Sequence, residues 1–253
     1  MGLDSLTYRA VVFLLLASLG NFCFQNCSEA RFGSSDKAYG GQGSQGGAIG
    51  PGDPPGGGNP PPDDVDDPAD PDVGCGPNLI HNGDFEVVDS RAGLVHGHRL
   101  DRLAEQNLWD VYGSIPSWEA EAGTSGIEVL ASTVVPAISG KHYVELDSHP
   151  NQSLGSNTNS GMLQSLFVTA ADRYVLSFLY RGRTHSPVDN GIDVFIDDSL
   201  VGHRADGQMA TWQKVKIHLN LASGPKEILF RATGAATTLG GLVDRISLRL
   251  ACK

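Results

Sequence analysis

The sequence predicts an all-β fold, a sandwich or barrel of short strands, over residues 75–253. Apolar and polar residues alternate with period two in about ten short segments, which is the pattern of strands with one buried face. Clusters of Gly, Asn, Asp and Pro separate these segments and predict turns. Two cysteines, Cys75 and Cys252, bracket the whole stretch. These three observations indicate one β domain at the C-terminal end of the chain.

Residues 1–30 predict a signal peptide. Arg9 is followed by the apolar run AVVFLLLASL, which is too short to cross a bilayer, since a spanning helix needs about 20 apolar residues. The small residues Ser28 and Ala30 suit a cleavage site at the end of this segment. We therefore expect a secreted, extracellular protein with no membrane span after cleavage. A retained anchor is the alternative.

Residues 31–74 differ in composition from the rest. They are rich in Gly and Pro and then carry six Asp between Asp63 and Asp72. Such a segment has almost nothing to bury, so we expect a disordered linker. It adds to a formal net charge of −11, a sign that argues against nucleic acid as a partner. The charge favours cations, basic partners or mineral, unless the segment is a solvated tail with no ligand.

The cysteines support an oxidising compartment. The chain has four, and cleavage after Ala30 removes Cys23 and Cys27. In a secreted protein the remaining pair, Cys75 and Cys252, is most simply a disulfide. Two free buried thiols are the alternative.

The strand segments follow in order along residues 75–253. The segment 173–181 is the clearest, because four large apolar or aromatic residues fall on one face: Tyr174, Leu176, Phe178 and Tyr180. The other expected strands are 78–80 and 84–88 around the turn Asn82-Gly83, then 127–130, 140–148, 162–168, 192–197, 215–219, 228–230 and 242–250. A short helix is expected within 98–109, where Leu100, Leu103, Ala104 and Leu108 have helical spacing.

The segment 140–148, GKHYVELDS, is the predicted centre of the binding function. In its alternation Tyr143, Glu145 and Asp147 share one face, which we expect to be exposed to solvent. A polar loop without periodicity follows, SHPNQSLGSNTNSG. The strand would then present an aromatic ring and two carboxylates at the mouth of a loop, which suits binding better than catalysis.

Five motifs carry a resemblance to a known family. They are NLIHNGDFE at 78–86, IPSW at 115–118, YVELDS at 143–148, RYVLSFLYRGR at 173–183 and LVDRISL at 242–248. With them the chain resembles secreted carbohydrate-binding-module-like domains with a galactose-binding-like jelly-roll β-sandwich. It is also similar to plant cell-wall and bacterial surface proteins with an NGxFE opening and an ELDS-like strand. The helical insertion at about 90–108 departs from that pattern.

The resemblance implies two features near the domain ends. The first and last strands lie side by side in such families, which would make the Cys75–Cys252 disulfide a link between the two ends of the domain. Many members hold a structural calcium there, and the matching groups are Glu86, Asp244 and the Lys141 carbonyl. Calcium takes six to eight oxygen ligands, so two carboxylates with carbonyls and water suffice. The alternative is that both carboxylates are ordinary strand-end acids.

A sugar site needs a flat aromatic ring and polar groups for the hydroxyls. The stacking candidates are Trp109, Tyr112, Tyr143 and Trp212. The hydrogen-bonding candidates are Glu145, Asp147, Arg181, Arg183, Asp189, Asn190 and Asp193. Of the tryptophans, Trp118 and Trp212 fit a core position better than a stacking platform. Asn151, in the sequence Asn-Gln-Ser, is a predicted N-glycosylation acceptor.

An enzyme is the least favoured class. Glu145 and Asp147 lie two residues apart, about 6.5 to 7 Å at the backbone, a spacing compatible with an inverting glycosidase. Acidic pairs of this spacing are common on exposed strands, and the sequence has no GxSxG, HExxH or P-loop motif. We therefore expect a binding protein for extracellular polysaccharide or glycoprotein glycans. The alternative is an acidic structural extracellular-matrix protein that associates with matrix proteins, cations or mineral.

Overall fold

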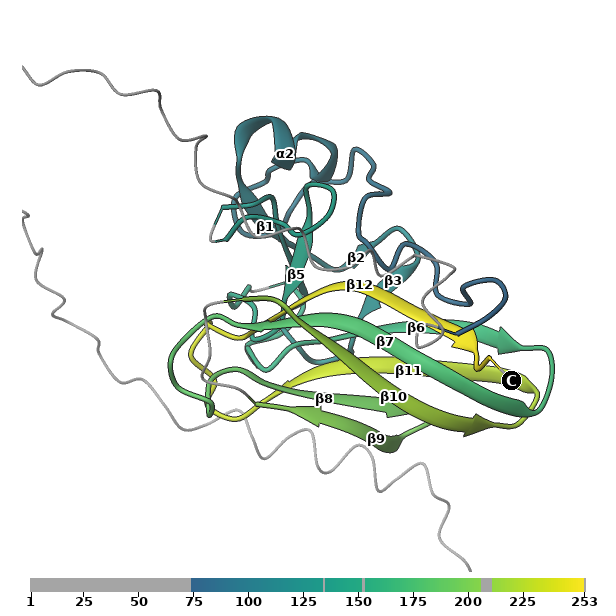
Figure 1. Ribbon diagram of the computed structural model, residues 1–253. Helices are drawn as coiled ribbons and strands as arrows, with labels where there is room; N and C mark the ends of the chain where they lie inside the picture. Colours follow the sequence, from purple (N-terminus) through teal and green to yellow (C-terminus); the bar gives the residue numbers. More distant parts are fainter. Residues whose placement is uncertain (1–73, 134, 152, 206–210, 253) are drawn as a thin grey trace, which may run out of the picture. The chain divides into compact units, whose positions relative to one another are not determined.

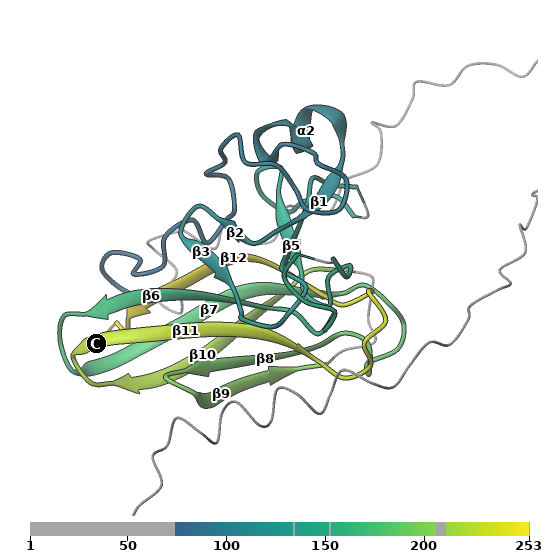
Figure 2. The same cartoon turned by 180° about the vertical axis from the view of Figure 1, so that it is seen from behind.

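The computed structural model describes residues 74–133, 135–151, 153–205 and 211–252. They form two six-stranded antiparallel sheets that face each other as a β-sandwich (Figure 1; Figure 2). The predicted all-β sandwich is therefore confirmed. The predicted signal peptide and all of the predicted linker except Gly74 lie outside the described residues. Within the described residues, no helix has the length and apolarity needed to span a membrane.

The first sheet has the strand order β1-β4-β5-β12-β7-β10. Its longest strand, β7, buries Tyr174, Leu176, Phe178 and Tyr180, the face that the sequence predicted. The strands are β1 (Trp109–Tyr112), β4 (Ile127–Leu130), β5 (Tyr143–Glu145), β12 (Gly241–Leu250), β7 (Asp172–Gly182) and β10 (Gln213–Leu221). The predicted strand over 140–148 is thus shorter than expected, three residues long.

The second sheet has the order β2-β3-β6-β11-β8-β9. A two-residue turn joins β8 to β9, and its residues Asp197 and Asp198 both have positive φ, 47° and 63°. Asp tolerates this backbone conformation, which two-residue hairpins require. The strands are β2 (Ser114–Ile115), β3 (Trp118–Ala120), β6 (Gly161–Val168), β11 (Gly224–Thr233), β8 (Gly191–Ile196) and β9 (Ser199–Arg204). The sequence prediction missed β1, β2, β3 and β9.

The predicted helix is confirmed as a 3-10 turn, η1 (Leu100–Arg102), followed by α2 (Leu103–Gln106). Leu100 and Leu103 are buried and anchor it to the core. The helix ends at Asn107, whose φ of 54° is left-handed, a common helix terminus for Asn.

The predicted strand pair over 78–80 and 84–88 is wrong. Asn82 and Phe85 have positive φ, 51° and 60°, which interrupts an extended backbone. The segment instead lies against β12 and is held there by separate hydrogen bonds. Leu79 N donates to Leu248 O, and Ile246 N donates to Gly83 O, both at 2.9 Å. The expected proximity of the domain ends is nevertheless confirmed.

A disulfide joins Cys75 to Cys252, with their Cα atoms 5.1 Å apart. The Cys75 amide also donates to the carbonyl of Leu250, so the first described residues are held against the last strand. The bond therefore links the two ends of the domain, as the resemblance implied.

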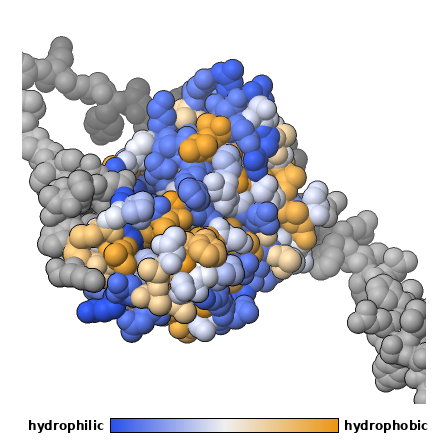
Figure 3. Space-filling model, turned by 90° about the vertical axis from the view of Figure 1, so that its right-hand side faces the viewer, coloured by the Kyte–Doolittle hydropathy of each residue, from blue (hydrophilic) through white to orange (hydrophobic). Residues whose placement is uncertain are grey.

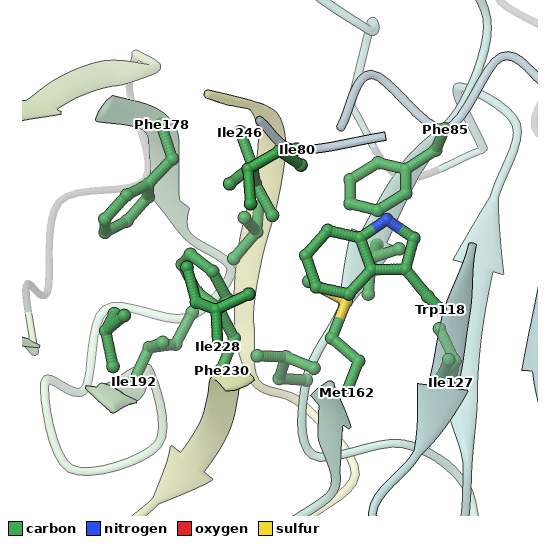
Figure 4. Close-up of a cluster of buried hydrophobic side chains, with 14 of the residues drawn as sticks. Ile80, Phe85, Trp118, Ile127, Met162, Phe178, Ile192, Ile228, Phe230 and Ile246 are labelled. Carbon is green, nitrogen blue, oxygen red and sulfur yellow. The ribbon is translucent and has the colours of Figure 1, made fainter. Parts of the chain in front are cut away.

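Trp118 is the largest of the fully buried side chains. It lies between Phe85 and Met162 (Figure 4), with the Phe85 ring centroid 6.1 Å from its own. Its Nε1 donates to the carbonyl of Asn82 at 2.9 Å, so the indole N–H is satisfied in the core. The predicted core position of the IPSW tryptophan is confirmed.

Large apolar side chains are exposed at a few separate places. The face shown in Figure 3 has small apolar groups separated by hydrophilic residues. The exposed large apolar residues among those described are Val87, Leu94, Leu154, Phe167, Val188, Leu200 and Leu239.

Candidate ligand-binding face

The prediction that one face of 140–148 is exposed to solvent is wrong. Tyr143, Glu145 and Asp147 each have 0% exposure. Strand β5 lies inside the first sheet, between β4 and β12. Its outward face is covered by a second apolar cluster made of Leu130, Val135, Tyr143 and Leu242, with Trp109, Ala137 and Trp212 packed against it. Alternation along the strand therefore identified its two faces but not that both of them are buried.

Tyr143 is held within this second cluster. Its Oη donates to the carbonyl of Val135, and the amide of Val135 lies 3.2 Å from the same oxygen. The Trp212 ring meets it edge-on at 5.6 Å, and Trp212 Nε1 donates to the carbonyl of Pro136 at 3.3 Å. Both rings stabilise the loop after β4, and Tyr143 is not accessible to a ligand.

Two buried glutamates lie opposite each other on this face. Glu128 of β4 and Glu145 of β5 are register partners, with exposures of 1% and 0%. The Arg183 guanidinium pairs with Glu145, and the Gly240 amide donates to Glu145 Oε1 at 2.9 Å. Burial, with the Glu128 charge adding to it, holds the pKa of Glu145 well above its ordinary value. Sequence reasoning missed Glu128, because only strand register places it beside Glu145.

His149 pairs with the other glutamate, Glu128. Its backbone N and its Nδ1 both lie 2.9 Å from Glu128 Oε2. The hydrogen bond to Glu128 raises the pKa of His149 above its ordinary value. The His149 and Arg183 side chains are 34% and 19% exposed, whereas their glutamate partners are buried. The two cationic groups are thus the part of this arrangement that a ligand can reach.

Trp109 completes the arrangement. Its ring centroid lies 4.4 Å from that of His149, and His96 meets it edge-on at 4.6 Å. Trp109 is half-buried at the edge of the first sheet, in β1. We call this set the Trp109 cluster, and its members are Trp109, Glu128, Glu145, His149 and Arg183. It combines an aromatic surface with N–H donors that are held in place by buried carboxylates.

The loop that carries Arg183 is organised by Asn190. This buried amide accepts hydrogen bonds from the backbone N of Arg183 and Thr184, at 2.9 and 3.0 Å, and donates to the carbonyls of Thr184 and Ser186. Asp189 lies in the same loop, 3.3 Å from the Thr184 hydroxyl. Both predicted residues therefore shape the loop that positions Arg183.

Asp147 also has a structural role. Its Oδ2 accepts hydrogen bonds from the amides of Thr237 and Leu239, at 2.8 and 3.3 Å, which ties the loop before β12 to the end of β5. Arg181 lies across Leu242 from Glu145, and burial lowers its pKa. Two predicted residues lie elsewhere. Tyr112 is a core residue whose Oη donates to His98 O, and Asp193 is on the second sheet, 2.6 Å from His203 Nδ1.

The predicted calcium ligands lie near one another, but the hydrogen bonds of Glu86 and Asp244 differ. Glu86 Oε1 accepts hydrogen bonds from the amides of Lys141 and His142, at 2.6 and 2.7 Å, and its Oε2 lies 3.2 Å from His142 Nδ1. Asp244 is fully buried, and its Oδ2 has no hydrogen-bond partner in the described part of the chain. Burial raises the pKa of Asp244 to about 8, and the charges of Glu86 and Asp84 add to the shift.

The two carboxylates differ in how well they suit a calcium ion. The free oxygen of Asp244 fits a cation, whereas both oxygens of Glu86 already accept hydrogen bonds from protein groups. No group of three or more His, Cys, Asp or Glu that could hold a metal occurs among the described residues.

Asn151 lies at a tight local turn. Its Nδ2 donates to the carbonyl of Ser125, and its Oδ1 accepts from the amides of Ser153 and Leu154, at 3.0 and 2.9 Å. An N-linked glycan attached at Nδ2 would leave one N–H for the bond to Ser125. Glycosylation at this residue stays a prediction.

A groove that no member of the Trp109 cluster lines contains a cavity of about 650 Å³. Its lining includes Arg91, Leu94 and Leu154, and it adjoins a second cavity of about 310 Å³ that shares Arg91 and Ser114. Arg91 is paired with Asp89 and donates to the Ser114 hydroxyl at 2.7 Å. Of the predicted ligand residues, Tyr112 alone lines it, so the sequence did not point to this groove.

No family model matches the chain. Curated relatives include the multifunctional-autoprocessing repeats-in-toxin proteins of Vibrio vulnificus and Vibrio cholerae serotype O1. Each is 25% identical, over 174 and 175 residues or 67% of this chain. The chain spans 3% of the length of these toxins.

Solved structures with a similar fold include the K1 cleaved adhesin domain of Lys-gingipain from Porphyromonas gingivalis W83. It is 12% identical with a TM-score of 0.41, covering 56% of this chain and 97% of the adhesin domain. A family 35 carbohydrate-binding module from Clostridium thermocellum is 20% identical with a TM-score of 0.30, covering 57% of this chain and 92% of the module. At these identities the likeness concerns the fold alone.

Proposed function

We propose that this chain is a secreted, non-enzymatic protein that binds extracellular carbohydrate through the Trp109 cluster. One observation carries the proposal: Trp109 lies beside His149, a partly exposed N–H donor paired with buried Glu128. The register partner of Glu128, Glu145, pairs with a second partly exposed donor, Arg183. Carbohydrate recognition needs both an aromatic surface for the ring and fixed polar groups for the hydroxyls. The Cys75–Cys252 disulfide supports secretion, because such bonds persist in oxidising compartments.

Each residue of the cluster has a separate task under this proposal. Trp109 supplies the surface on which a sugar ring stacks. His149 and Arg183 donate hydrogen bonds to hydroxyl or ring oxygens. Glu128 and Glu145 do not touch the ligand, because they are buried; they hold the two donors in orientation. Preorganised donors lose little conformational entropy on binding, which favours affinity for a small ligand.

The positions of the carboxylates support binding over glycoside hydrolysis. Asp147 and Glu145, the pair that the sequence suggested, are both fully buried, and each accepts hydrogen bonds from backbone amides. A glycosidase needs two carboxyl groups on either side of the scissile bond, in contact with the substrate.

A glycan array on the secreted chain tests the proposal, with His149→Ala as the variant. We expect the wild-type chain to bind a defined set of glycans and the variant to lose most of that binding. His203→Ala is the matched control, since His203 also pairs with a carboxylate, Asp193, but on the second sheet. An array without bound glycans would contradict the proposed function. Equal loss in both variants would remove the binding site from the Trp109 cluster.

A further inference from the structure

The groove beside β2 consists of two adjoining cavities, of about 650 and 310 Å³. Arg91 and Ser114 line both of them, so the cavities meet at β2, and the second continues over β3 and β6 (Figure 2). Cavities of this size are typical of sites that hold a ligand. We call the two cavities together the β2 groove.

One end of the β2 groove is apolar and open to solvent. Leu94 and Leu154 line it, and their side chains are 38% and 40% exposed. They are two of the few large apolar residues that the described part of the chain leaves exposed. An apolar group of a ligand would remove both leucines from water, which favours its binding.

The aromatic residues of the groove offer no stacking surface. Tyr112 and Trp118 line it, but each is only 1% exposed. A sugar site typically presents an accessible flat ring, as half-buried Trp109 does in the Trp109 cluster. The β2 groove therefore favours an aliphatic ligand group over a sugar ring.

The centre of the groove is a neutral, fixed wall. Arg91 Nε and Nη2 donate to the two carboxylate oxygens of Asp89, at 2.7 and 2.5 Å. Arg91 Nη1 donates to the Ser114 hydroxyl at 2.7 Å. Bidentate pairing of this kind fixes the guanidinium geometrically, so Arg91 shapes the groove and does not serve as a site for a free anion.

Strand β2 has a free edge at the groove. It is the outermost strand of the second sheet and pairs with β3. The amide of Ala120 donates to the carbonyl of Gly113, and hydrogen-bonded pairs alternate along an antiparallel ladder. The backbone N–H and C=O of Ser114 therefore point away from β3, toward the free edge. Such edge groups can pair with an extended peptide as an added strand.

The other end of the groove carries a negative charge. Glu119 lines the second cavity, is the register partner of Ser114, and is exposed. Unlike Asp89, it has no ion pair within the part of the chain that the structure describes. A cationic side chain of a ligand would complement this carboxylate.

We propose that the β2 groove binds an extended peptide segment of a partner protein. An aliphatic side chain of that segment packs against Leu94 and Leu154, its backbone hydrogen-bonds to Ser114, and a Lys or Arg side chain pairs with Glu119. No residue of the Trp109 cluster lines the groove, so the inference is independent of the proposed glycan binding.

Selection from a random peptide library displayed on phage tests the inference, with the intact secreted chain as the target. We expect enrichment of peptides that combine Leu, Ile or Val with Lys or Arg. Synthetic copies of these peptides should bind Leu154→Asp about tenfold or more weakly than wild type, because the new carboxylate resists burial under an apolar group. Leu200→Asp is the matched control, since Leu200 is 58% exposed but lies on β9, and it should bind like wild type.

Two further variants test the separate contacts. Leu94→Asp should weaken binding as Leu154→Asp does. Glu119→Lys should reverse the charge preference, so that the same selection enriches Asp or Glu in place of Lys or Arg. A library without enriched peptides would overturn the proposal, as would selected peptides that bind wild type, Leu94→Asp and Leu154→Asp equally well. An unchanged charge preference in Glu119→Lys would contradict the assigned role of Glu119.

Discussion

Glu128 and Glu145 face each other across β4 and β5, and both carboxylates are buried. Like charges directly opposite in a sheet destabilise it, and here each glutamate has its own cationic partner, Arg183 or His149. The stability of this part of the sheet therefore depends on two residues from loops, and loss of either leaves a buried carboxylate uncompensated.

The first prediction concerns Arg183. Arg183→Gln should lower the free energy of unfolding by about 3 to 5 kcal/mol, the usual cost of removing one partner of a buried ion pair. Arg231→Gln is the matched control, because Arg231 pairs with Glu121 but is 39% exposed, and it should cost at most about 1 kcal/mol. Urea denaturation measures both. Equal losses would mean that the Glu145 pair contributes no more than an exposed one.

The second prediction concerns pH. Glu128 raises the pKa of His149 above its ordinary value of 6.5, so the folded state binds more protons than the unfolded state above that pH. The stabilisation from His149 is therefore complete below pH 6.5 and is lost as pH rises through the raised pKa. Glu145 acts in the same direction, from its ordinary value of 4.5 upward.

The measurement is the free energy of unfolding of wild type and His149→Gln between pH 5 and 9. The difference between the two curves should shrink as pH rises above 6.5. His203→Gln controls for the loss of a surface imidazole. A constant difference across this range would contradict the assigned role of His149.

The third prediction concerns calcium, which we propose as a structural ion at Asp244. Chelation should lower the melting temperature, since an ion at a hundred times its Kd stabilises by about 2.7 kcal/mol. Asp244→Asn should abolish the response to calcium. Glu86→Gln should weaken or abolish it, and Glu145→Gln should leave it intact. A melting curve that is unchanged by chelation in the wild-type chain would show that no such site exists.

The fourth prediction concerns the disulfide. Intact-mass analysis under non-reducing conditions should find Cys75 joined to Cys252 and no free thiol in the mature chain. Replacing both cysteines with Ser should cost about 2 to 5 kcal/mol, because the bond closes a loop of nearly the whole domain. A covalent dimer instead of the internal bond would contradict this pairing.

The fifth prediction separates the two function classes. Deleting residues 31–74 should leave glycan binding unchanged if the Trp109 cluster carries it. If the chain is instead an acidic matrix protein, the deletion should abolish its association with matrix, cations or mineral. Pull-down on matrix extracts and the glycan array, run on the same two chains, decide between these outcomes.

The local patterns of this sequence were sufficient for much of the fold. The alternation in β7, the helical spacing of Leu100 and Leu103, and the predicted pairing of Cys75 with Cys252 all agree with the structure. The strand and the helix depend on the spacing of neighbouring residues, and the disulfide depends on one long-range pair. The NGDFE segment differs, because Asn82 and Phe85 adopt positive φ in contact with Trp118, which no local pattern predicts. Gly83, between them, accepts a hydrogen bond from Ile246 of β12.

The candidate site depended on tertiary structure. By itself the sequence determined that Tyr143, Glu145 and Asp147 share one face of a strand. It did not determine that this face is buried, because the covering residues, Val135 and Trp212, come from other segments. The sequence also did not predict the role of Glu128, since its position opposite Glu145 follows from strand register. Periodicity reports the geometry of one strand, whereas burial and pairing depend on which distant segments pack against it.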